Sequence, residues 1–478
     1  MVTGRVEAIR RLLSPHGRPK GRPTELYRIL AAATGPISNP ISKPISKPIS
    51  KSDVLGALQT DFDPIESQAL AVKLINLWMA KQHFERQDAV LHSRPLAVVV
   101  DPANACNLAC PGCVHSEHAK ESHWFDWKPG VLAPTRFAAL LDRYGPAALF
   151  VTLCNYGEPL VNPETPNFIR LAKSYLLRTM LSTNLSLPRF DAEAYVNSGL
   201  DYMVLSIDGA TQTVYERFRR KGSLDLVIQN IRKLVEAKRQ SGRSTPVIIW
   251  RFLAFEHNVH EIPAAMEMAR QLGVDRFEAS AAWDVSWDDP KIRPAPIAPQ
   301  QVEFGLDVYS ALTKNWNPFP DSLNAAAAGR EFDALPDRLP VAPAGVPASS
   351  APSCEWLYKS ITMDSSGRIF PCCCAPRQGA DLTFGTFDPA TPGGEEVFNS
   401  PLHQLARGFF AGPQQYLDAN ADGHEGRHPF CVKCKWDKVA DPDRMQMRNY
   451  FSMTGSGVFD DPVLDLLTEW RPTSKNDL

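Results

Sequence analysis

Three cysteines that lie close together in the sequence are the residues most suited to chemistry. Cys106, Cys110 and Cys113 follow the pattern C-x3-C-x2-C directly after the apolar run at residues 96–100. Three thiolates at this spacing can bind three irons of a four-iron cubane and leave the fourth iron open to another molecule. The alternative is a zinc site with four protein ligands, for which His115 is near enough in the sequence to be the fourth.

A second set of cysteines lies towards the C-terminus. A hairpin of two short strands, predicted over residues 360–370, would bring Cys354 and Cys372 together. The C-x2-C pair Cys431 and Cys434 follows later in the chain. Four thiolates complete either one cubane or one zinc ribbon, and the residues alone leave both alternatives open.

The segments that must position the first cysteine set alternate between strands and helices. Short β-branched runs are predicted to be strands at residues 96–100, 149–153, 179–182, 202–207, 247–253 and 276–279. Helices are predicted between them, as at residues 191–198, 212–240 and 259–272. This alternation predicts an α/β fold, a partial (β/α)6 barrel, which is followed by a C-terminal cysteine-rich domain. Because the C-terminal ends of barrel strands carry the active site, the first cysteine set is expected there.

The chain of 478 residues is long enough for more than one domain. A tetrapeptide repeat with regularly spaced prolines, at residues 37–51, predicts an extended linker, and residues 65–92 predict one long helix. The predicted parts are a helical N-terminal extension with this linker (1–94), the barrel core (95–288), a Pro- and Ala-rich insertion or linker (289–353), the auxiliary cluster domain (354–438) and a C-terminal tail (439–478).

Composition and charge exclude several classes of partner. Lys and Arg number 51 against 53 Asp and Glu, a net charge of -2, so no strong field favours nucleic acid or an anionic membrane. No apolar run has the length of a membrane span, and no secretory signal is recognisable. Ten cysteines in such a chain favour metal binding over disulfides. We therefore expect a cytoplasmic protein in a reducing compartment.

On these residues the cysteine loop resembles that of the radical S-adenosylmethionine (SAM) superfamily. In that family a 4Fe-4S cluster binds SAM, and reductive cleavage gives a 5′-deoxyadenosyl radical that abstracts hydrogen from a substrate carbon. The segment Tyr156-Gly157-Glu158-Pro159 resembles the family's Gly-Gly-Glu-Pro motif, which binds the methionine amino group of SAM. One departure is Gly112, since the residue before the third cysteine is usually aromatic and near the adenine.

Further segments resemble SAM-binding positions of the same family. Asn184, after the third strand, matches the position that binds the ribose hydroxyls. Ser206 and Asp208, at the end of the fourth strand, match another position on the cofactor side. Arg219 resembles the arginine that meets the methionine carboxylate, a task that suits a planar guanidinium.

The second cysteine set resembles the opening of the SPASM and twitch auxiliary-cluster domains, through the spacing from Cys354 to Gly367 to Cys372. No cysteine follows Cys434, so the resemblance is to the shortened twitch form with one cluster. Adjacent side chains point to opposite sides, so at most two of Cys372 and its neighbours Cys373 and Cys374 bind one cluster. The predicted ligands of this second 4Fe-4S cluster are Cys354, Cys372, Cys431 and Cys434.

The resemblance implies a radical SAM enzyme of oxidoreductase type, a dehydrogenase or an epimerase. Family members with an auxiliary cluster act on small molecules such as sugars and aminocyclitols, or on peptides and proteins. Because residues 1–94 lack the strand pattern of a peptide-binding unit, a small molecule is the expected substrate, with a peptide as the alternative. A flavodoxin or ferredoxin would supply electrons, and Cys373 or Cys154 is the candidate hydrogen donor.

Two other classes of protein remain as alternatives. In the first, both cysteine sets are structural zinc sites and the scaffold only binds. In the second, the protein only transfers electrons, which is disfavoured because that role would not need Glu158, Asn184 and Arg219 together.

Overall fold

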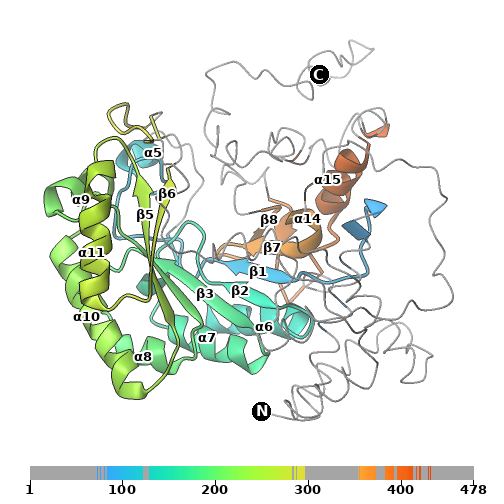
Figure 1. Cartoon of the computed structure of the whole chain (residues 1–478). Helices are drawn as coiled ribbons and strands as arrows, with labels where there is room; N and C mark the ends of the chain where they lie inside the picture. Colours follow the sequence, from blue (N-terminus) through green and yellow to red (C-terminus); the bar gives the residue numbers. More distant parts are fainter. Residues whose placement is uncertain are drawn as a thin grey trace, which may run out of the picture.

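One nine-stranded sheet forms the centre of the described part of the chain (Figure 1). The structure is a computed structural model that describes residues 86–121, 129–282, 285–286, 288–295, 356–372, 383–391 and 396–412, with single residues between 73 and 84 and between 354 and 431. The strand order is β6-β5-β4-β3-β2-β1-β7-β8-β9. The linker repeat and the C-terminal tail lie outside the described residues.

The first six strands pair in parallel, each with the next along the chain. They are β1 (Ala97–Val100), β2 (Phe150–Thr152), β3 (Arg178–Thr183), β4 (Tyr202–Ser206), β5 (Val247–Ala254) and β6 (Arg276–Ala281). All six were expected from the β-branched runs. The sheet ends at β6 on one side and at β9 on the other, so it does not close, and the predicted partial barrel is confirmed.

The two faces of the sheet have different surroundings because successive side chains of a strand point to opposite sides. Leu181, Met203 and Trp250 belong to the main core, which lies between the sheet and the helices. Met180, Val204 and Ile249 form a separate small cluster on the opposite, concave face. Apolar packing on both faces agrees with the near-continuous apolar character of these strands.

Helices cover the outer face of the sheet in Figure 1, each connecting one strand to the next. The larger ones are α6 (Pro134–Tyr144), α7 (Thr165–Ser174), α10 (Leu224–Ser241) and α11 (Ile262–Leu272). The short helices α5 (Glu117–Glu121), α8 (Ala192–Asn197) and α9 (Gln212–Phe218) and the 3-10 turns η1 (Pro159–Val161) and η2 (Val259–Glu261) lie among them. Because each crossover brings the chain back to the same edge, the loops that follow β1 to β6 gather there.

Two helix predictions need correction. The single helix expected over residues 212–240 is two helices, α9 and α10, because the Ser223 side chain accepts a hydrogen bond from Leu226 N and starts α10 anew. The helix expected to reach residue 92 stops before it, since Gln87 has a left-handed backbone with φ 55° and residues 88–92 are not helical.

The predicted C-terminal hairpin is present and continues the main sheet. After α14 (Trp356–Lys359), strand β7 (Ser360–Met363) runs parallel to β1, and β8 (Arg368–Phe370) and β9 (Gly385–Thr386) follow antiparallel. Helix α15 (Pro401–Ala411) packs behind them, and its fully buried Arg407 donates hydrogen bonds to the carbonyl groups of Leu357, Ala89 and Phe398. The predicted domain boundaries remain predictions.

A buried lysine anchors the N-terminal region to the edge of the sheet where the strands begin. Lys73, which is 1% exposed, donates to the carbonyl oxygens of Gly145, at 2.9 Å, and Ala148. Burial lowers the pKa of Lys73 to about 7. Among the described helices, none has the length and apolar character needed to span a membrane.

Candidate active site at the carboxyl ends of the strands

The first cysteine set lies in the loop that follows β1. Cys110 is buried, and Cys106 and Cys113 are partly exposed. Burial raises the pKa of all three thiols, that of Cys113 to about 12, and the neighbouring cysteines raise the pKa of Cys106 and Cys113 further. Cys106 and Cys113 both pack against the small buried cluster that contains Cys110, so the three side chains lie near one another. Only thiolates bind metal, so occupation of this loop by iron would release protons.

Hydrogen-bond donors from three segments surround these sulfurs. Asn184 Nδ2, just after β3, lies 3.7 Å from Cys106 Sγ, which also accepts from Leu108 N at 3.4 Å. Arg219 Nη1, at the break between α9 and α10, lies 3.9 Å from Cys110 Sγ. Donors to cluster sulfurs are one means by which proteins tune iron-sulfur centres.

The Tyr156-Gly157-Glu158 segment after β2 packs directly on the cysteine loop. Glu158 N donates to Ala105 O at 2.8 Å. Asp101 Oδ1 accepts from Tyr156 N at 2.9 Å and from Gly157 N at 3.2 Å, which joins the ends of β1 and β2. A Cβ on Gly157 would lie 1.6 Å from the carbonyl oxygen of Ala103, so the close approach of the two backbones requires glycine here.

The Glu158 carboxylate is buried and held by donors from the end of β3. It is 3% exposed, and it accepts from Thr183 Oγ1 at 2.7 Å, from Asn184 N at 2.8 Å and from Leu160 N at 3.1 Å. Burial raises the pKa of Glu158, and these hydrogen bonds oppose the rise. The carboxylate therefore has a fixed position beside the cysteine loop.

Arg219 forms an ion pair with Asp208, which follows β4 and is fully buried. Arg219 Nε donates to Asp208 Oδ2 at 2.5 Å, while Asp208 Oδ1 accepts from Leu253 N at 2.6 Å. Although burial disfavours a charged guanidinium, the Asp208 carboxylate raises the pKa of Arg219 above its usual value. Because Asp208 occupies the Nε edge, the guanidinium is oriented with Nη1 towards Cys110.

A row of polar side chains crosses the concave face at the level of the strand ends. Ser182 Oγ and Ser206 Oγ are 3.0 Å apart on β3 and β4. Next along the row, Arg251 on β5 is paired directly with Glu278 on β6, at 3.0 Å and 3.4 Å for the two nitrogen-oxygen contacts. Glu278 was not predicted from the sequence, although a lone carboxylate inside an apolar strand is a usable signal.

Cys154, a candidate hydrogen donor, follows β2 on the same edge of the sheet as the cysteine loop. Its side chain is buried, and burial raises the pKa of the thiol to about 12. The group therefore stays a neutral S–H at neutral pH, which is the form that can give a hydrogen atom. The other candidate, Cys373, lies outside the described residues.

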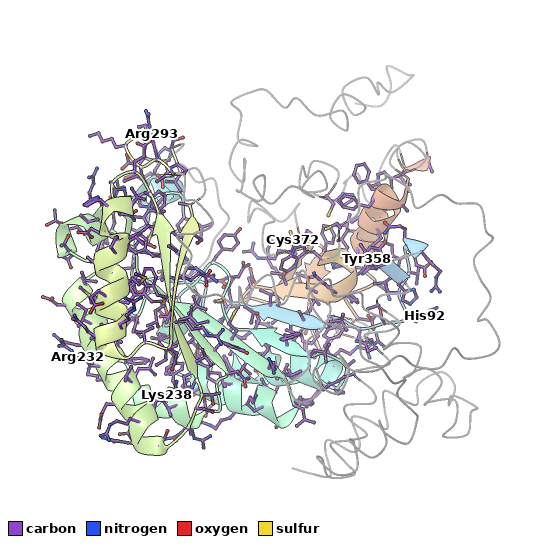
Figure 2. All side chains as sticks on the ribbon, in the orientation of Figure 1. His92, Arg232, Lys238, Arg293, Tyr358 and Cys372 are labelled. Atoms are coloured by element: carbon purple, nitrogen blue, oxygen red, sulfur yellow. The ribbon has the colours of Figure 1, made fainter. Side chains whose placement is uncertain are left out.

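The second cysteine set lies at the opposite ends of the strands, where β1 begins. Ser360 is level with Ala97 at the start of β1, and β8 runs back from the turn so that Phe370 pairs with Thr362. Cys372, two residues beyond Phe370, is therefore near the beginning of β1 and not near its end. In Figure 2 Cys372 and Tyr358 are both labelled among the C-terminal strands, apart from Arg293, which follows β6.

Three of the four predicted auxiliary ligands are described, and they share one neighbourhood. Burial raises the pKa of Cys354 to about 12, and the nearby Cys372 adds to the effect. Cys431 is buried in the main core. Burial lowers the pKa of Arg407, and Tyr358 and Cys431 oppose this fall. The Arg407 guanidinium lies over the Tyr358 ring. Cys374 and the fourth predicted ligand, Cys434, lie outside the described residues.

The donor set of the first loop fits an iron-sulfur cluster. Among the described residues, no three His, Cys, Asp or Glu side chains converge on one point as the ligands of a single metal ion do. A cubane places each cysteine sulfur on a different iron, so its ligands are not expected to converge in this way.

One family model and several known proteins are similar to this chain. A model of the radical SAM superfamily matches residues 100–269. The chain is 23% identical to the PqqA peptide cyclase of Gluconobacter oxydans over 323 residues, which are 66% of this chain and 80% of the cyclase. It is 25% identical over 215 residues to the mycofactocin maturase MftC of Mycobacterium tuberculosis, and spans 50% of that protein. The SAM-bound structure of Streptococcus suis SuiB is 16% identical, with a TM-score of 0.40 over 68% of this chain and 69% of SuiB.

Proposed function

Because residues 100–269 form a radical SAM domain, we propose that this protein binds SAM beside a 4Fe-4S cluster and abstracts hydrogen from a peptide. The observation that carries the proposal is the convergence of Asn184 and Arg219 on the sulfurs of Cys106 and Cys110. Side chains from separate crossovers meet there on a three-cysteine loop. A structural zinc site would not need a charged guanidinium aimed at one of its ligands.

The peptide replaces the small molecule that the sequence analysis favoured. The support is the relative that aligns over most of its own length, a cyclase whose substrate PqqA is a peptide. The absence of a recognisable peptide-binding pattern in residues 1–94 was a weak argument, because a substrate can be bound by other parts of a chain. Oxidation or epimerisation of a small molecule loses its support.

The residues of the site have two tasks in this proposal. Cys106, Cys110 and Cys113 hold the cluster. When bound, the cluster and SAM supply a 5′-deoxyadenosyl radical after one-electron reduction by a flavodoxin or ferredoxin. The remaining residues bind and orient SAM and exclude water.

Glu158 offers its buried carboxylate to the SAM ammonium group, since an ammonium needs fixed acceptors and the Thr183 and Asn184 donors hold the carboxylate in place. Arg219 and Ser206 suit the SAM carboxylate, with Asp208 orienting the guanidinium. Tyr156 and Gly157 contribute the backbone that positions Glu158, and the Asn184 side chain is assigned to the ribose hydroxyls.

We assign the second cysteine set to one auxiliary 4Fe-4S cluster, and Cys154 to hydrogen donation in any reaction that returns a hydrogen atom. Cys154 suits that role because it is a neutral thiol on the edge of the sheet where SAM would bind. Cys373 is the weaker candidate, since its sequence neighbour Cys372 lies at the other edge.

The test is anaerobic reconstitution of the full chain, with iron, sulfide and zinc analysis and an assay for 5′-deoxyadenosine after dithionite reduction. We expect about eight irons and eight sulfides per chain and dithionite-dependent 5′-deoxyadenosine. The triple change of Cys106, Cys110 and Cys113 to Ala should abolish 5′-deoxyadenosine and leave about four irons. Zinc in place of iron, or cofactor cleavage by the triple variant, contradicts the proposal.

The substrate class is tested by mass spectrometry after turnover. The reconstituted enzyme is incubated with a library of synthetic peptides and, separately, with a panel of sugars and aminocyclitols. A peptide that loses the mass of two hydrogens, or that gains deuterium at a carbon when turnover is carried out in D2O, supports the proposal. Turnover of the sugars or aminocyclitols alone restores the small-molecule interpretation.

A further inference from the structure

The segment that follows β6 folds back over the first cysteine loop. Gly112 N donates to Asp288 Oδ2 at 2.6 Å, across 176 positions of sequence. Val285 and Ile292 pack with Leu108 and Cys110 in a small buried cluster of their own. The loop is therefore held by a charged hydrogen bond and by apolar contact from the same segment.

Gly112 shows how closely the two segments fit. Its backbone is left-handed, with φ 76°, and a Cβ there would lie 2.2 Å from Val285 Cγ1. The side chain of Val285 thus occupies the space that a side chain at position 112 would take. Gly112 stands where the radical SAM superfamily usually has an aromatic residue. Glycine is required here because the backbone is left-handed and Val285 leaves no space for a side chain.

The charges around the loop are arranged unevenly. Arg219 places a positive charge beside Cys110, while Asp288 places a carboxylate on the N–H of the residue before Cys113. Asp288 also acts on the Cys113 thiol, whose pKa is raised first by burial and further by this carboxylate. A second ion pair, between Arg220 and Asp289, fixes the same turn to the break between α9 and α10.

We infer that Asp288 is a positioning residue for the cluster loop and that its negative charge lowers the reduction potential of the cluster bound there. The inference rests on the proposed function, in which Cys106, Cys110 and Cys113 hold that cluster. A nearby negative charge disfavours the addition of an electron, and the reduction potential of an iron-sulfur cluster depends on charge and hydrogen bonding around it. The short contact to Gly112 also keeps Cys110 and Cys113 at their spacing.

The experiment compares Asp288→Asn and Asp288→Ala with the parent chain, all reconstituted anaerobically. Asn keeps an oxygen that can accept from Gly112 N but removes the charge, whereas Ala removes both. Glu267→Gln is the matched control, because Glu267 is an exposed carboxylate on α11 that bonds only neighbours on its own helix. The readouts are iron content and the midpoint potential of the EPR signal that changes when SAM is added.

We expect Asp288→Asn to keep its iron and to shift the midpoint potential upward, and Asp288→Ala to retain less iron than the parent. The Glu267→Gln control should match the parent in both. Unchanged potential in Asp288→Asn together with unchanged iron in Asp288→Ala overturns the inference. If the parent chain shows no SAM-responsive signal at all, the proposed function fails, which is a different result from a responsive cluster that ignores Asp288.

Discussion

Replacement of Gly157 by Ala tests how the active-site edge is assembled. The added Cβ would lie 1.6 Å from Ala103 O, a backbone atom that cannot rotate away. Ordinary contact requires roughly 3.5 Å, so the loops after β1 and β2 would have to separate by roughly 2 Å. Overpacking of this kind lowers the free energy of unfolding by about 1 to 3 kcal/mol. Because the contacted backbone is rigid, we expect a loss of about 3 kcal/mol.

The consequence should reach the cluster as well as the fold. Glu158 N binds Ala105 O, one residue before Cys106, so a displaced position 157 moves both the carboxylate and the first cysteine. With a urea dependence of about 3 kcal/mol per molar, we expect the unfolding midpoint of the apo protein to fall by about 1 M. Reconstituted Gly157→Ala should also hold fewer irons than the parent.

Gly242→Ala is the matched control for this prediction. Gly242 ends α10 with φ 65°, and nothing lies within 4 Å of an added Cβ, so only the left-handed conformation is penalised, by about 1 kcal/mol. Circular dichroism in urea and iron analysis measure both variants. The reasoning is refuted if Gly157→Ala matches Gly242→Ala in midpoint and in iron content.

Three further predictions concern single side chains. Burial lowers the pKa of Lys73 from 10.5 to about 7, so between these pH values the unfolded chain binds the proton more tightly and the free energy of unfolding rises with pH. Relative to Lys73→Met, the parent should gain about 1.4 kcal/mol of stability per pH unit in that range. Urea unfolding of both proteins at several pH values measures this, and parallel pH profiles would contradict it. Glu158→Gln should weaken SAM binding about tenfold or more in equilibrium dialysis, because a charge-assisted contact of about 1.5 to 3 kcal/mol is lost; unchanged affinity removes Glu158 from the SAM site. Cys354→Ala should lose about half of the iron and still form 5′-deoxyadenosine without substrate turnover, whereas loss of 5′-deoxyadenosine would show that the two cysteine sets are not independent.

The strands could be predicted from sequence because each is a short β-branched run between turn signals, and β1 to β6 begin and end within two residues of the expected ranges. Cys106 was selected by the spacing of the three cysteines, and Glu158 and Asn184 by their resemblance to positions of the radical SAM superfamily; their places in the loops after parallel strands agree with a shared edge. The contacts of Asn184 and Arg219 with the cysteine sulfurs agree with that selection. Their binding roles remain predictions.

Other features depended on information that no local pattern contains. The break between α9 and α10 at Arg219 was not predicted because the amphipathic pattern continues through it. The one local signal for the start of α10 is Ser223, which is its N-cap residue. The partner of Glu278 is set by the pairing of β5 with β6. The partner of Asp288 is Gly112, which lies far away in the sequence. Pairing between β1 and β7 joins segments separated by more than 250 residues, which periodicity does not indicate.

The parallel pairing of β7 with β1 determines what the second cysteine set can do. The first set follows Val100 at the end of β1, while Cys372 lies level with Ala97 at its beginning, and these two levels are about 10 Å apart along the strand at 3.3 Å per residue. A thiol at that distance cannot reach a substrate carbon bound beside SAM, whereas an electron can travel between centres without contact. In the proposed function, a cluster held by Cys354 and Cys372 would therefore accept an electron from a substrate radical, and Cys154, which lies at the other ends of the strands, would supply any hydrogen atom.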